Sequence, residues 1–305
     1  MTELQERLND VRERLPEEVR LVAVSKYHPR EAILEAYDAG QRIFGESRVQ
    51  ELQEKQVALP HDIEWHFIGH LQVNKVKYIA PYITLIHAVD SLKLLQEIDK
   101  QCARHEDERA ERGLSPKISV LLQLHVAQEE TKFGFTPTEC KAFLSSGEWR
   151  KLEHVEIAGI MCMATNTDDE EQITAEFQTA YEFFEFARER YFADSESFRE
   201  CSWGMSDDFP IAIEHGSTLV RVGSYIFGPR QYAPATTVQT QGDEDRKNAA
   251  LLYEQGLDFA RHSEWGRAAT AFRKALEIDP ESPAAQSLSM IDDILAFYHK
   301  DNFNP

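Results

Sequence analysis

The fold is decided at residues 21–29, which read LVAVSKYHP. Four apolar residues and Ser25 lead into Lys26, and Pro29 then opens a segment with helical periodicity. A short apolar run predicts a buried strand, and proline is favoured in the first turn of a helix. We therefore expect the amine of Lys26 at the carboxyl end of a buried strand, where α/β folds place their chemistry. A lone lysine at such a place is more often a solvated charge than a functional group.

Strands and helices alternate along the chain on both sides of this stretch. Short apolar runs predict eight strands, at residues 21–24, 42–44, 63–68, 84–88, 118–125, 155–160, 198–202 and 219–222. Helical periodicity is found at 2–15, 30–39, 47–58, 92–105, 137–145, 170–191 and 208–214. Eight alternating units imply parallel pairing with right-handed crossovers. They favour an α/β fold with a closed (β/α)8 barrel over residues 1–230.

The composition changes after the expected barrel. Residues 231–245 are polar, contain proline and lack apolar periodicity, so they predict a linker. Residues 246–305 are expected to form a small all-α extension. Its residues 247–280 show the spacing of one tetratricopeptide repeat, carried by Gly256, Phe259, Ala268, Phe272, Ala275 and Pro280. One repeat cannot bury its own apolar face, so this hairpin is either a partner-binding module or a structural element capped by a helix at 283–299.

The totals limit the class of protein. The chain has 305 residues, 42% of them hydrophobic, and a formal net charge of −20. Such a charge argues against nucleic acid or an anionic membrane as a partner. No stretch approaches the roughly 20 apolar residues of a membrane span, and the amino terminus lacks the apolar core of a signal peptide. The four cysteines are widely spaced, which indicates buried thiols and a cytoplasmic location.

Three later stretches share the expected edge of the barrel with Lys26. Residues 65–75 read WHFIGHLQVNK, residues 203–208 read WGMSDD and residues 216–228 read GSTLVRVGSYIFG. The histidines of the first stretch fit no usual metal-ligand spacing, so we expect no metal site. Ser206 has the position of a helix cap, and the same geometry offers a hydroxyl and amides to an anion.

A phosphate-bearing aldehyde matches this arrangement. Barrels of this kind often hold phosphate in the loops after strands seven and eight, and Ser206 and Gly223 occupy those loops. A lysine across the barrel mouth suits an aldehyde at the other side of the same ligand. Pyridoxal 5′-phosphate has both groups, and lysine forms a Schiff base with it.

The motifs together resemble the pyridoxal phosphate homeostasis protein family, which is similar to the barrel domain of alanine racemase, a fold-type III protein. The resemblance covers residues 1–230 and rests on Lys26 in its Val-Ser-Lys context, on 44–51, and on the three stretches above. It implies a Schiff base with Lys26 and a phosphate held by Ser206 and the Gly223 amide. It also implies that Arg221 faces the pyridine nitrogen. The further cofactor-binding candidates are Ser217, Thr218 and Asn74.

Two features depart from that family. Many members have asparagine and an aromatic residue where this chain has Ser47 and Arg48, which puts any cofactor contact of that asparagine in doubt. The helical extension is the second departure.

Both a carrier and an enzyme remain open. Arginine does not accept a proton, so a pyridine nitrogen facing Arg221 would stay neutral and the ring would be a weak electron sink. Alanine racemase draws its second acid/base from another domain, and we expect no such domain after residue 230. Tyr253 or Tyr298 could in principle reach the mouth instead, but tyrosines on apolar helix faces are far more often packing residues. The expected function is pyridoxal phosphate homeostasis or delivery by a monomer with little or no catalysis, and the alternative is an amino-acid racemase or related enzyme. Lys132 is a further amine that could reach the mouth, although a solvated loop lysine is commoner.

Overall fold

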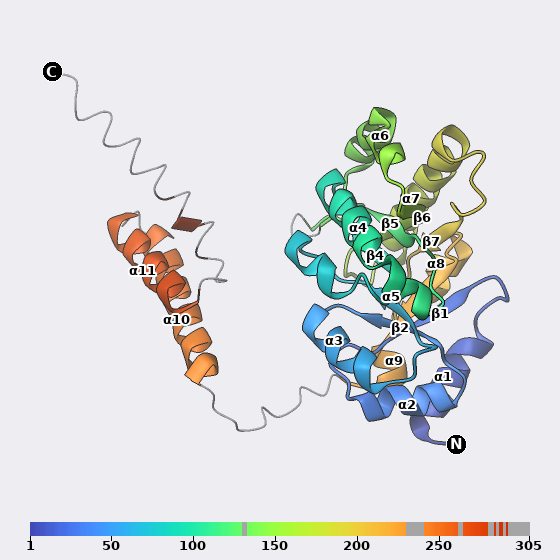
Figure 1. Cartoon of the computed structure of the whole chain (residues 1–305), viewed down its shortest axis with the longest axis horizontal. Helices are drawn as coiled ribbons and strands as arrows, with labels where there is room; N and C mark the ends of the chain where they lie inside the picture. Colours follow the sequence, from blue (N-terminus) through green and yellow to red (C-terminus); the bar gives the residue numbers. More distant parts are fainter. Residues whose placement is uncertain are drawn as a thin grey trace. The chain divides into compact units, whose positions relative to one another are not determined.

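The computed structural model describes residues 1–129, 133–229, 241–261 and 265–279, together with the single positions 284, 287, 288 and 291. The chain divides into two compact units, Met1–Tyr232 and Ala233–Pro305 (Figure 1). Lys132, Arg230, Pro280 and Tyr298 lie outside the described residues, as does most of the expected helix at 283–299. Helix α10 begins at Gln241, so the last five residues of the expected linker are helical.

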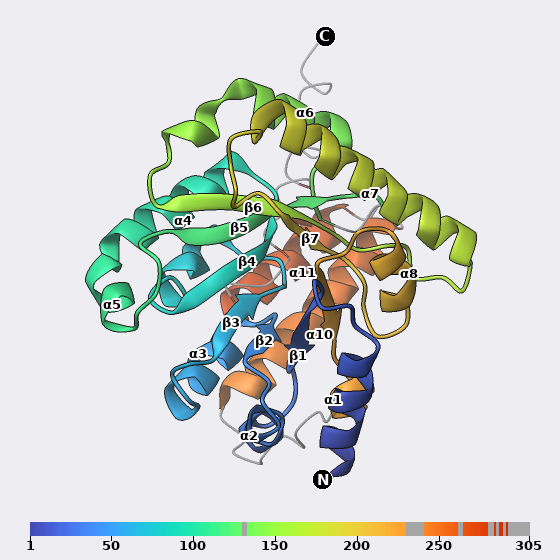
Figure 2. The same ribbon diagram turned by 90° about the vertical axis from the view of Figure 1, so that its right-hand side faces the viewer.

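The first unit is a closed barrel of eight parallel strands in the order β1 to β8, which confirms the predicted fold. The strands are β1 Arg20–Val24, β2 Ile43–Glu46, β3 Glu64–Phe67, β4 Ile83–Val89, β5 Ile118–Leu124, β6 Val155–Cys162, β7 Glu200–Ser202 and β8 Leu219–Val222. Strand β8 pairs with β1 and closes the ring. The strands therefore form an inner layer with the helices outside it (Figure 2).

The seven helices expected from periodicity are all present. They are α1 Glu3–Glu13, α2 Arg30–Asp38, α3 Val49–Ala58, α4 Leu92–Arg104, α6 Pro137–Ser146, α7 Glu170–Tyr191 and α8 Phe209–Glu214. Four short elements lie between them, namely η1 Val73–Tyr78, α5 Glu106–Glu111, η2 Glu148–Lys151 and α9 Ser224–Phe227. Within the described residues no helix combines the length and the apolarity that crossing a bilayer would require.

Each strand of the barrel is covered on both faces, which explains why the strands read as continuous apolar runs. Their outer faces belong to the large core beneath the helices. Their inner faces fill the barrel with a smaller cluster that includes Val22, Leu85, Leu121 and Leu219. Buried polar side chains share this interior with the apolar cluster, and they include Arg221 of the site described below.

The second unit contains α10 Gln241–Arg261 and α11 Trp265–Ile278. Ala268, Phe272 and Ala275 are buried in its core, as the repeat-like spacing requires. Gly256 lies against the Phe272 ring, where an added Cβ would come within 2.4 Å of a ring carbon. The two helices thus approach closely at Gly256, while their likeness to a tetratricopeptide repeat stays a prediction.

Candidate functional site

A cavity of about 270 Å³ opens at the carboxyl ends of β1, β7 and β8. Its polar lining comes from Lys26, His28, Ser206, Asp207, Arg221, Gly223 and Ser224. Its apolar lining includes Val24, Ile68 and Met163. The structure therefore brings four sequence-predicted residues, Lys26, Ser206, Arg221 and Gly223, into one pocket.

Lys26 follows β1 after one residue, Ser25, and is half-buried. The next residue, Tyr27, has a φ of 67°, the left-handed region that a bulky residue rarely adopts. The Tyr27 amide donates a hydrogen bond to Glu51 Oε1 at 2.7 Å, and the His28 amide bonds to the Ser25 carbonyl at 3.1 Å. These bonds hold a tight turn at the residues that flank the lysine.

A buried ionic cluster lies beneath this turn. Lys55 Nζ donates to the Ser25 carbonyl at 2.9 Å, to Glu46 Oε1 at 2.8 Å and to Glu51 Oε1 at 2.6 Å. The Ser25 hydroxyl also donates to Glu46 Oε1, at 2.6 Å. Burial raises the pKa of Glu46 to about 7, although the nearby Lys55 ammonium opposes that rise. The cluster ties β2 and α3 to the residues on both sides of Lys26.

The two residues that depart from the resembled family lie next to this turn. The Arg48 guanidinium is 4.9 Å from the centre of the Tyr27 ring, a cation–π contact. Ser47 packs against Gly69, where an added Cβ would come within 2.7 Å of the Ser47 carbonyl. Neither Ser47 nor Arg48 lines the cavity.

Arg221 is held inside the barrel by three hydrogen bonds. Its Nη1 donates to the Ser202 carbonyl at 2.7 Å and to Ser202 Oγ at 2.6 Å, and its Nη2 donates to the Cys162 carbonyl at 3.0 Å. Its side chain is 4% exposed, and burial lowers the pKa of the guanidinium. Within the described part of the chain these bonds use three of the five N–H donors of an arginine, so donors remain for a ligand in the cavity.

At the other side of the cavity, hydroxyl and amide groups converge on one point. The Gly223 amide donates to Ser206 Oγ at 3.3 Å, and the Ser224 hydroxyl donates to the same oxygen at 3.0 Å. Gly223 packs on β1, because an added Cβ would come within 3.0 Å of the Val24 carbonyl. These donors suit the oxygens of a phosphate, and the site therefore fits the phosphate end of the expected cofactor.

Three predicted cofactor-binding residues are not at the cavity. Ser217 and Thr218 precede β8, whereas Gly223 follows it, so roughly 15 Å of strand separates them. The Ser217 hydroxyl donates to the Trp203 carbonyl at 2.7 Å, and that of Thr218 donates to Glu200 at 3.0 Å. Asn74 is exposed on η1. These residues belong to the packing of the strand ends and to the surface.

The structure adds His28 and Ser224, which the sequence reasoning missed. His28 is buried and stacks on Phe227 at 5.1 Å between ring centres. Both residues stand within two positions of a predicted site residue, which was the available signal. Among the described residues no group of histidine, cysteine, aspartate or glutamate side chains could hold a metal ion.

Comparison with known proteins gives the family of the barrel. The model of the alanine racemase N-terminal domain family matches residues 1–231. The pyridoxal phosphate homeostasis protein of Helicobacter pylori is 37% identical over 211 residues, which are 68% of this chain and 87% of that protein. The human protein of the same name is 37% identical over 227 residues, covering 72% of this chain and 79% of the relative.

Solved structures give the same result. PipY of Synechococcus elongatus, in a structure with pyridoxal phosphate bound, is 36% identical with a TM-score of 0.63, and the match covers 74% of this chain and all of PipY. Alanine racemase of Clostridium difficile is 17% identical with a TM-score of 0.57 over 73% of this chain and 56% of that one, and this likeness shows the fold alone. The chain thus belongs to the pyridoxal phosphate homeostasis protein family, as the motifs around Lys26, Ser206 and Arg221 predict.

Proposed function

We propose that this chain binds pyridoxal 5′-phosphate covalently through Lys26 and acts in the homeostasis or delivery of that cofactor. One observation carries the proposal: a single cavity is lined by an amine, a guanidinium and a cluster of hydroxyl and amide donors. Lys26 supplies the amine, and Ser206, Gly223 and Ser224 hold the phosphate. The cofactor, when bound, supplies an aldehyde for the lysine and a ring that accepts electrons.

Arg221 limits the chemistry available at this site. A guanidinium donates hydrogen bonds and accepts none, so the side chain would hold a pyridine nitrogen without protonating it. The two backbone carbonyls and the serine that bind Arg221 keep it in place. The cofactor ring would accept electrons weakly, which favours storage over chemistry.

We further propose that the chain has little or no catalytic activity. A racemase of the two-base kind needs acid/base groups on opposite faces of the substrate carbon. Among the described lining residues the titratable side chains are Lys26, His28, Asp207 and Arg221. His28 stands two residues from Lys26 on the same turn, and Tyr253 lies in the second compact unit, where its ring packs 5.7 Å from that of Phe272.

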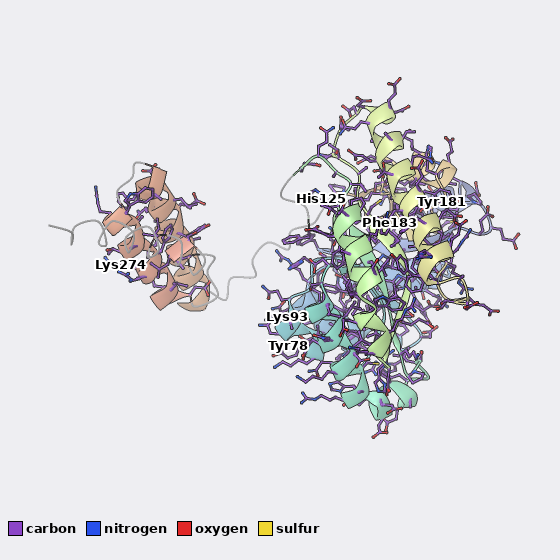
Figure 3. The ribbon with its side chains drawn as sticks, turned by 90° about the horizontal axis from the view of Figure 1, so that it is seen from above. Tyr78, Lys93, His125, Tyr181, Phe183 and Lys274 are labelled. Atoms are coloured by element: carbon purple, nitrogen blue, oxygen red, sulfur yellow. The ribbon has the colours of Figure 1, made fainter. Side chains whose placement is uncertain are left out.

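The test is a visible absorption spectrum of the purified protein with pyridoxal phosphate, followed by borohydride reduction and peptide mapping. We expect an adduct on Lys26, and no adduct in Lys26→Ala. The matched control is Lys93→Ala, on α4 outside the cavity (labelled in Figure 3), which should keep the adduct. A colourless wild-type protein, or an adduct elsewhere, would refute the proposal. Exchange of the α-proton of an amino acid with deuterated solvent at enzyme-like rates would favour the racemase alternative instead.

The remaining expectations concern location and partners. The four cysteines are buried thiols without disulfides, which supports a cytoplasmic location. We propose that the barrel acts as a monomer and that the α10–α11 pair recruits a protein partner. A chain ending at Arg230 should bind the cofactor as tightly as the full chain and lose the partner. Unfolding of the truncated barrel would show that the helical pair is structural.

A further inference from the structure

A chain of hydrogen bonds crosses the barrel interior from Arg221 on β8. Arg221 Nη1 donates to Ser202 Oγ on β7 at 2.6 Å. Ser202 Oγ is 2.9 Å from His87 Nδ1 on β4, and His87 Nε2 is 3.0 Å from His66 Nδ1 on β3. Four side chains from four strands are thus joined in one line that ends at the cofactor cavity.

All four side chains are buried, with exposures of 4% or less. Burial lowers the pKa of His66 to about 3, and it lowers the pKa of His87 as well, together with the neighbouring His66 and the positive charge of Arg221. Both imidazoles are therefore neutral, and each has one nitrogen that donates and one that accepts.

Because both imidazoles are neutral, the donor and the acceptor in each hydrogen bond of the line can be assigned. Ser202 Oγ already accepts a hydrogen from Arg221, and in the described structure His87 Nδ1 is the acceptor within reach of the serine proton. If His87 accepts at Nδ1, its proton is on Nε2, and that proton is donated to His66 Nδ1. In each hydrogen bond of the line, the donor is then the residue nearer to Arg221 and the acceptor is the residue farther from it. This arrangement strengthens the serine oxygen as an acceptor for the guanidinium.

We propose that His87, together with Ser202 and His66, is a positioning residue that holds the Arg221 guanidinium in the orientation needed at the cofactor cavity. This inference rests on the proposed function. None of the three residues lines the cavity, so they act through Arg221 and not on the cofactor itself. Burying two polar imidazoles next to the apolar cluster of the barrel interior costs free energy unless they are hydrogen-bonded, and the line supplies those hydrogen bonds.

The test measures pyridoxal phosphate affinity in a double-mutant cycle. Ser202→Ala breaks the line by removing one atom, and His87→Phe breaks it while keeping a ring in the interior. Each is expected to lower affinity about tenfold, the effect of one hydrogen bond to a charged group, and to shift the absorption band of the bound cofactor. In an Arg221→Met background neither change should alter the pyridoxal phosphate affinity by more than about twofold, because no guanidinium remains to be positioned.

His125→Phe is the matched control, since His125 bonds to the Glu129 carbonyl and has no part in the line (Figure 3). It should leave the affinity and the band unchanged. His87→Asn keeps an acceptor near the Nδ1 position, so it should lose less affinity than His87→Phe. Circular dichroism checks that each variant is folded.

A second measurement needs no cofactor. The ¹⁵N shifts of the His87 ring report which nitrogen carries the proton, and we expect protonated Nε2 in the wild type and a changed Nδ1 shift in Ser202→Ala. Wild-type affinity in folded Ser202→Ala, or equal losses with and without Arg221, would overturn the inference. A proton on His87 Nδ1 would also overturn it. Failure of the wild-type protein to bind pyridoxal phosphate would instead refute the proposed function. The ¹⁵N shifts of the His87 ring would then be the remaining test of whether Ser202 donates to His87 and His87 donates to His66.

Discussion

Replacing Glu46 with glutamine is expected to change how the stability of the barrel depends on pH. The Glu46 side chain is fully buried, and burial raises its pKa from 4.5 to about 7. A carboxyl group whose pKa is higher in the folded state favours folding while it is protonated. Its contribution is complete below pH 4.5 and is lost as the pH rises through 7.

The size of the effect follows from the two pKa values. Between pH 5 and pH 8 the wild type should lose about 2–3 kcal/mol of unfolding free energy through this group alone, at roughly 1.4 kcal/mol for each pKa unit. Glutamine has the shape of the protonated acid and does not titrate. The stability of Glu46→Gln relative to the wild type should therefore rise by about that amount over the same range, while other titrations cancel in the difference.

Urea unfolding followed by tryptophan fluorescence measures this difference. Trp265 belongs to the second unit, so a Trp265→Phe background restricts the signal to the barrel. Glu54→Gln is the matched control, because Glu54 is exposed on the same α3 helix that carries Lys55. A difference between wild type and Glu46→Gln that stays within about 0.5 kcal/mol from pH 5 to 8 would refute the reasoning.

Three further changes have specific expected results. Gly223→Ala places a Cβ 3.0 Å from the Val24 carbonyl and should displace the amide of residue 223. We expect the pyridoxal phosphate affinity to fall about tenfold in a fluorescence titration. An unchanged affinity would show that this amide does not bind the phosphate. Gly256→Ala places a Cβ 2.4 Å from the Phe272 ring and should destabilise the second unit by about 1–2 kcal/mol, seen in Trp265 fluorescence, while the barrel is unaffected. Burial raises the pKa of Cys140 to about 12, and all four cysteines are buried. The native protein should therefore react slowly with Ellman's reagent at pH 8, whereas all four thiols should react in urea. Rapid labelling of the native protein would contradict this.

The sequence predicts the barrel well because its strands are buried on both faces. Such strands read as apolar runs of four to eight residues, and each of the eight expected runs lies within two residues of an observed strand. Helix α5, Glu106–Glu111, was missed because its sequence EDERAE has no apolar periodicity. The parallel arrangement also explains why Lys26 and Gly223 could be placed together, since both follow adjacent strands.

The site was harder to predict where contacts depend on strand length or on the barrel interior. Ser217 and Thr218 lie in the same glycine-flanked stretch as Gly223, but the four residues of β8 carry them to the other end of the barrel. His66 and His87 are 21 residues apart in the chain, and nothing in either local pattern indicates that their rings meet. Their contact depends on how β3 pairs with β4, whose register shifts between Trp65 and His66.

The pairing of β8 with β1 has a consequence for how the protein acquires its ligand. Arg20 through Ala23 align with Leu219 through Val222, so the two halves of the cavity come from opposite ends of the barrel sequence. During synthesis the pocket cannot exist until residue 224 has left the ribosome and the last strand has docked on the first. Cofactor capture would therefore report that the ring has closed, and a bound ligand would slow its reopening, as ligands do for any state they bind selectively. The pocket for the cofactor is thus completed only in the final step of barrel folding, when β8 docks on β1.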